Sequence, residues 1–267
     1  MKSNIEAGMP NTRVQPVLAG PRAADALGLD RVGEIRSSTH LSDRIFFSLA
    51  GVWFVVLSFV GFSPSFYFRV IPEPLPVHQV VHGVLSSAWV VVFLLQALLI
   101  SNHRVRWHAT LGTAAAFLLI VMIPVGFHVV LVKTAAGLKS VSGAGFNLTE
   151  LSVGAAFALA GLANRKRPFV HKRLMLFATL MLTVAAADRV AFVVGLEEVR
   201  LFRKVLAVAP GIALLGYDAL LLRRIPVLTA SCLAVVWLII WFIVSDLVFL
   251  HPTGEAIILA LTRILVW

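Results

Sequence analysis

Cysteine and charge are both scarce in this sequence. One cysteine, Cys232, occurs in 267 residues, and it lies inside an apolar run. A single cysteine excludes an intrachain disulfide and a cysteine metal cluster. Charged residues make up 13% of the chain and hydrophobic residues 59%, which is far from the composition of soluble globular domains. The composition therefore predicts a polytopic membrane protein.

Familiar catalytic motifs are also missing. The sequence has no P-loop, Rossmann glycine pattern, nucleophile elbow or HExxH segment, so no enzyme class follows from it. The N-terminal tail lacks the apolar core of a secretion signal, and we expect it to be retained. The net charge is +10, but the basic residues lie in loops between apolar runs rather than on one face. We therefore expect the lipid bilayer as the partner, and no nucleic acid.

Long apolar runs are what the sequence has in abundance. A spanning helix needs roughly 20 apolar residues, and the chain supplies about seven such runs. They lie near residues 45–63, 77–101, 108–132, 147–164, 171–196, 204–222 and 226–250. The predicted fold is all-α, a polytopic membrane helix bundle. Its expected parts are a flexible tail over 1–43, a transmembrane domain over 44–250 and an amphipathic interfacial helix over 251–267.

The distribution of Lys and Arg predicts the orientation of these spans. Fifteen of them fall on the side of the N-terminal tail and seven on the opposite side. Because basic loops are retained in the cytoplasm, the N-terminus is expected inside and the C-terminus outside. The expected location is a bacterial inner membrane.

A short internal repeat groups the spans into hairpins. The segments RVRWHATLG (104–112) and RPFVHKRLM (167–175) both place a basic turn, then a histidine, then a leucine three residues later. The segment RRIPVLT (223–229) keeps the basic pair without the histidine. We interpret the bundle as one leading helix followed by three hairpins with cytoplasmic turns.

One polar group is expected near the cytoplasmic ends of the helices. His108 and His171 each fall in the first turn of a predicted helix, and Asp218 lies near the end of another. Two neutral imidazoles on different helices can ligate a haem b from both faces, with arginines such as Arg173 accepting the propionates. The alternative is that these residues only sit at the headgroup level.

A second polar group is expected near the outer ends. His78 and His82 are four residues apart and share a helix face, as metal ligands do. His128, Glu150, Asp188 and Asp246 fall at the same depth and could complete a shell for a transition metal. His108 and His128, in contrast, are about 30 Å apart and face opposite ways, which argues against a chain of haems along that helix.

Three functions stay open at this stage. The first is a redox or cofactor-binding protein that uses these histidines as haem or metal ligands. The second is a proton-coupled transporter in which Asp188, Arg189, Asp246 and Glu150 form the pathway. The third is an accessory subunit that scaffolds other membrane subunits. A purely structural reading pairs Arg189 with Asp246 or Glu150, since buried charges are rarely left unpaired.

Several short segments resemble a group of uncharacterised multi-pass bacterial membrane proteins. The shared features are a His-Gly pair opening a helix, a basic turn before HxxLG, an RPxxHKRLM segment, and a YD pair before a double arginine. Here they stand as His82–Gly83, residues 108–112, residues 167–175, and Tyr217–Asp218 with Arg223–Arg224. The resemblance implies a common topology from the second to the seventh span, and no particular activity.

Overall fold

The computed structural model describes residues 29–68, 74–223, 225–238 and 252–266. The chain divides into two compact units, residues 1–41 and 42–267. In the first unit the described residues, 29–41, are helical and form the start of the first labelled helix. Apart from the start of that helix, all the elements discussed below lie in the second unit.

Every element within the described ranges is a helix, as the sequence predicts. They are α2 (Leu29–Phe62), continued by the π-helical turn η1 (Ser63–Tyr67), α3 (Val77–Ser101), α4 (Val105–Ala135), α5 (Val141–Ala163), α6 (Pro168–Leu182), α7 (Val184–Val193), α8 (Arg200–Leu221), α9 (Val227–Leu238) and α10 (Pro252–Val266).

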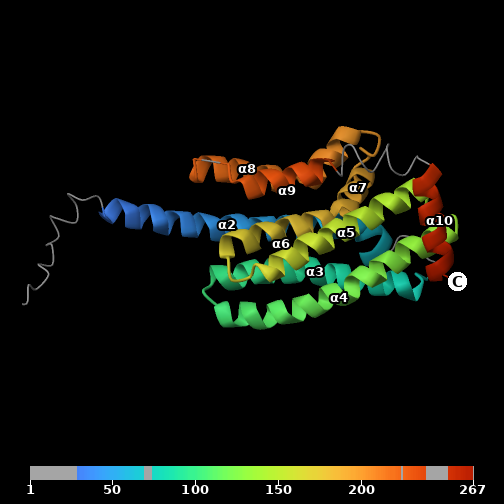
Figure 1. The fold of residues 1–267 in the computed structure, drawn as a ribbon, viewed down its shortest axis with the longest axis horizontal. Helices are drawn as coiled ribbons and strands as arrows, with labels where there is room; N and C mark the ends of the chain where they lie inside the picture. Colours follow the sequence, from blue (N-terminus) through green and yellow to red (C-terminus); the bar gives the residue numbers. More distant parts are fainter. Residues whose placement is uncertain (1–28, 69–73, 224, 239–251, 267) are drawn as a thin grey trace, which may run out of the picture. The chain divides into compact units, whose positions relative to one another are not determined.

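Short turns join consecutive helices into antiparallel hairpins. The pairs α3–α4, α5–α6 and α8–α9 all turn at the same end of the second unit, drawn at the left in Figure 1. We call this the basic end, because the three turns and the adjoining first helical turns carry most of the basic residues of these hairpins. The opposite end holds η1, the start of α3, the connections after α4 and α7, and the helix α10 (Figure 1).

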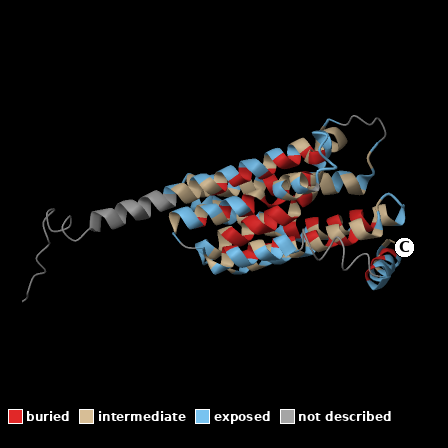
Figure 2. Ribbon diagram, turned by 90° about the horizontal axis from the view of Figure 1, so that it is seen from above, coloured by how far each residue is buried: buried red, intermediate tan, exposed pale blue. Residues whose placement is uncertain are grey.

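Helix α6 forms the centre of the packing. It lies against α5, α8 and α9, and Leu176, Phe177, Ala178, Thr179 and Leu180 are completely buried. Figure 2 shows the buried residues concentrated along the inside of the bundle, with exposed residues on its outer faces. Helix α2 adds Phe47, Ala50, Phe54 and Leu57 to this core. These four positions recur at helical spacing, so one face of α2 is turned inward.

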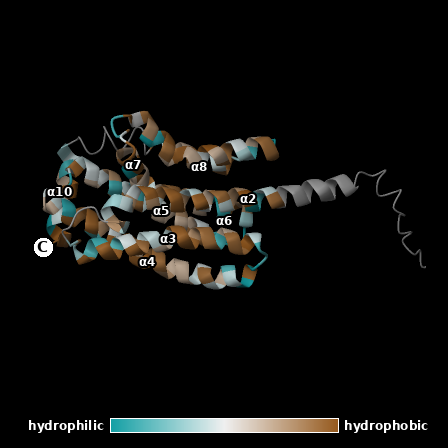
Figure 3. Cartoon of the chain, turned by 180° about the vertical axis from the view of Figure 1, so that it is seen from behind, coloured by the Kyte–Doolittle hydropathy of each residue, from teal (hydrophilic) through white to brown (hydrophobic). Residues whose placement is uncertain are grey.

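The outward faces are apolar as well. Leu49, Val56, Phe117, Ile120 and Leu220 are among the large apolar side chains that are exposed, and Figure 3 shows hydrophobic residues over most of the length of the helices. Among the described residues, five helices are long and apolar enough to cross a bilayer, and six if the bent pair α6–α7 counts as one span. An apolar exterior on helices of this length is what lipid contact requires.

The predicted fifth span, 171–196, is broken rather than continuous. Helix α6 ends at Leu182 and α7 begins at Val184, with a bend of 47° between them. The hydroxyl of Thr183 donates to the carbonyls of Thr179 and Leu180, 2.9 and 3.1 Å away. Threonine hydroxyls that bond back to the preceding turn favour helix bending, and this explains the position of the break.

The last two predicted segments are described in part. Helix α9 occupies the first half of the predicted seventh span, and residues 239–251, including Asp246, lie outside the described residues. Helix α10 crosses the ends of α4 and α5 at the opposite end (Figure 1). It buries Gly254, Ile258 and Thr262 and exposes apolar residues such as Ile264. One face of α10 is thus buried against the bundle and another is apolar and exposed, and its position at the membrane surface stays a prediction.

Candidate functional site

The first predicted pair of histidines comes together at the basic end. His108 lies in the first turn of α4 and His171 in the first turn of α6. Their ring centroids are 6.3 Å apart and their planes are inclined by 88°. Residues 63 positions apart in the sequence are therefore neighbours because the α3–α4 and α5–α6 hairpins turn at the same end.

Both rings are oriented by backbone carbonyls. Nδ1 of His108 donates to the carbonyl of Gln96, 3.3 Å away, and Nδ1 of His171 donates to the carbonyl of Gly161 at 2.8 Å. A carbonyl oxygen can only accept, so in both rings Nδ1 carries the hydrogen and a neutral ring keeps its lone pair on Nε2. Histidines that bind a metal through one ring nitrogen commonly donate a hydrogen bond of this kind from the other.

The same contact occurs in both hairpins. In each one, the histidine that opens the second helix bonds to a carbonyl near the end of the first helix. This agrees with the repeat of a basic turn followed by histidine. The hairpin α8–α9 has Thr229 in its first turn instead.

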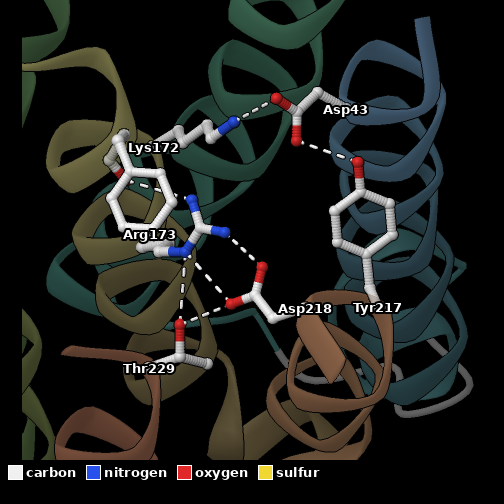
Figure 4. Close-up of polar contacts among 7 residues, drawn as sticks. Asp43, Lys172, Arg173, Tyr217, Asp218 and Thr229 are labelled. Atoms are coloured by element: carbon white, nitrogen blue, oxygen red, sulfur yellow. Dashed lines mark hydrogen bonds and ion pairs between the residues drawn. The ribbon is translucent and has the colours of Figure 1, made fainter. Parts of the chain in front are cut away.

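Arg173 and Asp218, predicted to accompany these histidines, bind each other. The pair is buried, with 1% and 0% of the side chains exposed, and Thr229 donates to Oδ2 of Asp218 at 2.7 Å. Nε of Arg173 donates to Asp218 and Thr229, and its guanidinium stacks 3.6 Å from the ring centroid of Phe169 (Figure 4). The guanidinium thus has most of its donors engaged by protein.

A second ionic group beside this pair was not predicted. Lys172 on α6 binds Asp43 on α2 at 2.5 Å, and the hydroxyl of Tyr217 on α8 donates to the other oxygen of Asp43 at 2.9 Å (Figure 4). The neighbouring residues Lys172 and Arg173 thus bind two different carboxylates, Asp43 and Asp218. Asp43 gave no signal in the sequence, because it stands just before the first apolar run, where a solvated acid is unremarkable.

At the opposite end, a second pair of imidazoles forms between α3 and α4. The ring centroids of His78 and His128 are 5.7 Å apart, with planes inclined by 86°. His82, one turn deeper on α3, lies against Gly126 of α4, and Leu151 of α5 contacts the same glycine. Nε2 of His78 and Nδ1 of His82 are buried without a hydrogen-bond partner.

Glu150 of α5 lies at this end too, and among the described residues it forms no ion pair. Its side chain is buried, and Oε2 accepts a hydrogen bond from Asn147 at 2.8 Å. Its other oxygen, Oε1, has no partner. The expected ion pair between Glu150 and Arg189 is not formed. Arg189 instead lies over the ring of Phe62, 4.7 Å from its centroid, and reaches Ser65 at 3.5 Å.

Asp188 makes the remaining ionic contact of the predicted outer group. It faces Arg203 of α8 at 3.9 Å, and both side chains are more than a third exposed. Within the described ranges, no three His, Cys, Asp or Glu side chains come together as a ready-made metal shell. The predicted metal site therefore appears as separate contacts: the imidazole pair, the isolated Glu150 and the exposed Asp188.

Comparison of the chain with protein-family models, with curated proteins and with solved structures gave no match.

Proposed function

We propose that this protein is a redox protein of a bacterial inner membrane that binds a haem through His108 and His171. The observation that supports the proposal is the pair of Nδ1–carbonyl hydrogen bonds. Both bonds leave Nε2 as the free nitrogen, and Nε2 is the atom with which such a histidine ligates a metal.

The two rings are close enough for one metal to bind both. Their centroids are 6.3 Å apart, and metal–nitrogen bonds are about 2.0–2.1 Å long. A bare metal ion needs about four ligands, and the described residues offer only two histidines here. A haem would need one or two protein ligands, because the porphyrin supplies four nitrogens. The two-histidine set therefore favours haem over a free ion.

When bound, haem supplies one-electron chemistry. The chain contributes the two ligands, the carbonyls that orient them and apolar helices that exclude water. Arg173 is held by Asp218, so basic residues of the turns, Arg104, Arg106 and Arg167, are the side chains left for the propionates in this proposal.

Absorption spectra of the purified protein test this function. Protein from its native membrane should show a Soret band, and iron should be present in elemental analysis. The double variant His108→Ala, His171→Ala should lose the band, because both axial ligands are gone. The matched control is His78→Ala, His128→Ala, which removes the other imidazole pair and should keep the band.

Two results would refute the proposal. One is a colourless, iron-free preparation after expression with an adequate haem supply. The other is a Soret band of unchanged position and intensity in the His108→Ala, His171→Ala variant. Loss of the band only in the control variant would indicate that the cofactor binds at the opposite end, between His78 and His128.

A further inference from the structure

Buried polar atoms without partners gather at the opposite end of the bundle. Within the described residues, six side chains have such an atom, and four of them belong to this end: His78, His82, Glu150 and Arg203. A buried polar atom without a partner has lost its hydrogen bond to water and gained none in return, which is unfavourable. Two of them, His82 and Glu150, belong to neighbouring helices, because His82 and Leu151 of α5 both lie against Gly126 of α4.

Glu150 is the most deeply placed member. It stands in the third turn of α5, and 4% of it is exposed. Among the described residues no Lys, Arg or His forms an ion pair with it. An ionised carboxylate is very unfavourable in apolar surroundings unless a cation or several donors compensate it, and here one donor, Asn147, is present. The neutral carboxylic acid is the form that suits this environment.

Asp218, the other buried carboxyl group among the described residues, differs from Glu150 in its partners. Asp218 is equally inaccessible, but it has Arg173 and Thr229 as partners for its oxygens. An ion pair and a hydroxyl donor therefore compensate Asp218, whereas Glu150 has a single amide donor.

A polar face of α5 connects Glu150 with the surface. Gly143, Asn147 and Glu150 are spaced at i, i+4 and i+7 and lie on one side of the helix. Ser140 caps its N-terminus, and Nζ of Lys139 lies 3.7 Å from the position that a Cβ on Gly143 would occupy. From Gly143 to Glu150 the helix rises about 10 Å. Asn147 lies between them and already bonds to the carboxyl group.

We infer that Glu150 is a proton-binding site, held as a carboxylic acid inside the bundle and exchanging its proton with water at the opposite end. On release, the O–H bond breaks and the proton passes to surface water, while the carboxylate keeps its hydrogen bond from Asn147. This inference does not depend on the haem site, because His108 and His128 mark opposite ends of α4, about 30 Å apart.

Charged groups from the neighbouring elements surround this site. Asp188 on α7 and Lys139 before α5 act on Glu150 electrostatically. Helix α4 contributes His128 and Lys133 at this end, and α10 carries Glu255 and Arg263, which are both exposed. The segment of α6 that packs on Gly154 is apolar, with Leu182 nearest.

Carbodiimide labelling of the full-length protein in lipid nanodiscs tests the protonation state. Dicyclohexylcarbodiimide is apolar and reacts with protonated carboxyl groups. At pH 7 the peptide containing Glu150 should gain the mass of the adduct, whereas Glu197 and Glu198, which are exposed in their loop, should not react. Asp218, which is ion-paired with Arg173, should also stay unlabelled. The assay uses the unaltered protein, so it does not depend on a variant that folds.

Infrared spectroscopy then tests exchange with the surface. The unaltered protein should show a protonated-carboxyl C=O band that is absent in Glu150→Gln and that shifts in D2O. Asn147→Ala should slow the shift, since it removes the group between the carboxyl and the surface. An unlabelled Glu150, or a spectrum without this band, would show an ionised residue and overturn the inference. A band that does not shift in D2O would equally overturn it, because the acid would then be sealed from water.

Discussion

At the residue scale, the strongest constraint is the ion pair between Arg173 and Asp218. Transfer of both charges out of water is unfavourable, so the pair persists because each partner compensates the other and Thr229 and Phe169 satisfy the guanidinium. Loss of one partner leaves a buried charge alone, which is much less favourable than the loss of the whole pair.

Removal of one member of this pair should destabilise the protein strongly. Asp218→Ala is expected to cost about 3–5 kcal/mol, because it leaves the guanidinium of Arg173 buried and uncompensated. Arg173→Lys should also destabilise, since an ammonium group cannot reproduce the fork of donors to Asp218 and Thr229. Thermal unfolding in detergent measures both effects.

The chain contains a matched control for this measurement. Asp188→Ala removes the other carboxylate–arginine contact, in which Asp188 and Arg203 are 3.9 Å apart and 45% and 35% exposed. Exposed pairs contribute about 0–1 kcal/mol. Equal losses of stability for Asp218→Ala and Asp188→Ala would contradict the assignment of Arg173–Asp218 as the buried pair.

At the scale of elements, glycines set how closely the first helix approaches its neighbours. A Cβ on Gly51 would lie 2.9 Å from Cα of Leu94 on α3, and one on Gly61 would lie 2.5 Å from the carbonyl oxygen of Ala186 on α7. Both contacts are with backbone, which cannot turn aside as a flexible side chain can. Small residues at helix contacts are how membrane helices pack closely.

Gly61→Ala should therefore destabilise the packing of α2 on α7. The methyl group forces the two backbones apart, and overpacking of this kind costs about 1–3 kcal/mol. The effect can be measured as the loss of folded protein on heating in detergent. Gly216→Ala is the control, because Gly216 is also helical but has nothing within 4 Å of its Cβ position. That change should be neutral or slightly stabilising. Unaltered stability of Gly61→Ala would contradict the close approach.

At the scale of the whole molecule, the hairpin turns carry the charge asymmetry. The basic end holds Arg104, Arg106, Arg165, Lys166 and Arg167 in two of its turns, while the connection at 136–140 holds Lys139 alone. Because cytoplasmic loops retain Lys and Arg, we expect the basic end, with the proposed haem ligands, to face the cytoplasm. Glu150 and α10 then lie toward the outside.

Single-cysteine labelling tests this orientation. In a Cys232→Ala background, Lys166→Cys and Leu138→Cys place one thiol in exposed loops at opposite ends. A membrane-impermeant maleimide added to intact spheroplasts should label Leu138→Cys and leave Lys166→Cys unmodified. Both variants should react after detergent is added, which controls for access. The reverse labelling pattern would place the basic end outside.

The sequence by itself determined the all-helical fold and the layering of its titratable groups. Few charges and long apolar runs leave helices as the way to satisfy the backbone in lipid, and histidines at helix starts then fall at defined depths. The expected placement of His108 and His171 at one end of the bundle and of Glu150 at the other rested on this spacing, and the structure places them there; their roles stay predictions.

Only the tertiary structure decided which of these groups meet. Arg173 forms an ion pair with Asp218, and Lys172 and Tyr217 both bind Asp43. Glu150 accepts a hydrogen bond from Asn147 and forms no ion pair among the described residues. Sequence spacing gives depth along a helix, but it gives neither the rotation of that helix nor the identity of its neighbour. Those are set by side-chain packing between segments that are far apart in the chain. The break at Thr183 has a local cause, the threonine hydroxyl that bonds to the preceding turn, but the apolar run by itself predicts one continuous helix.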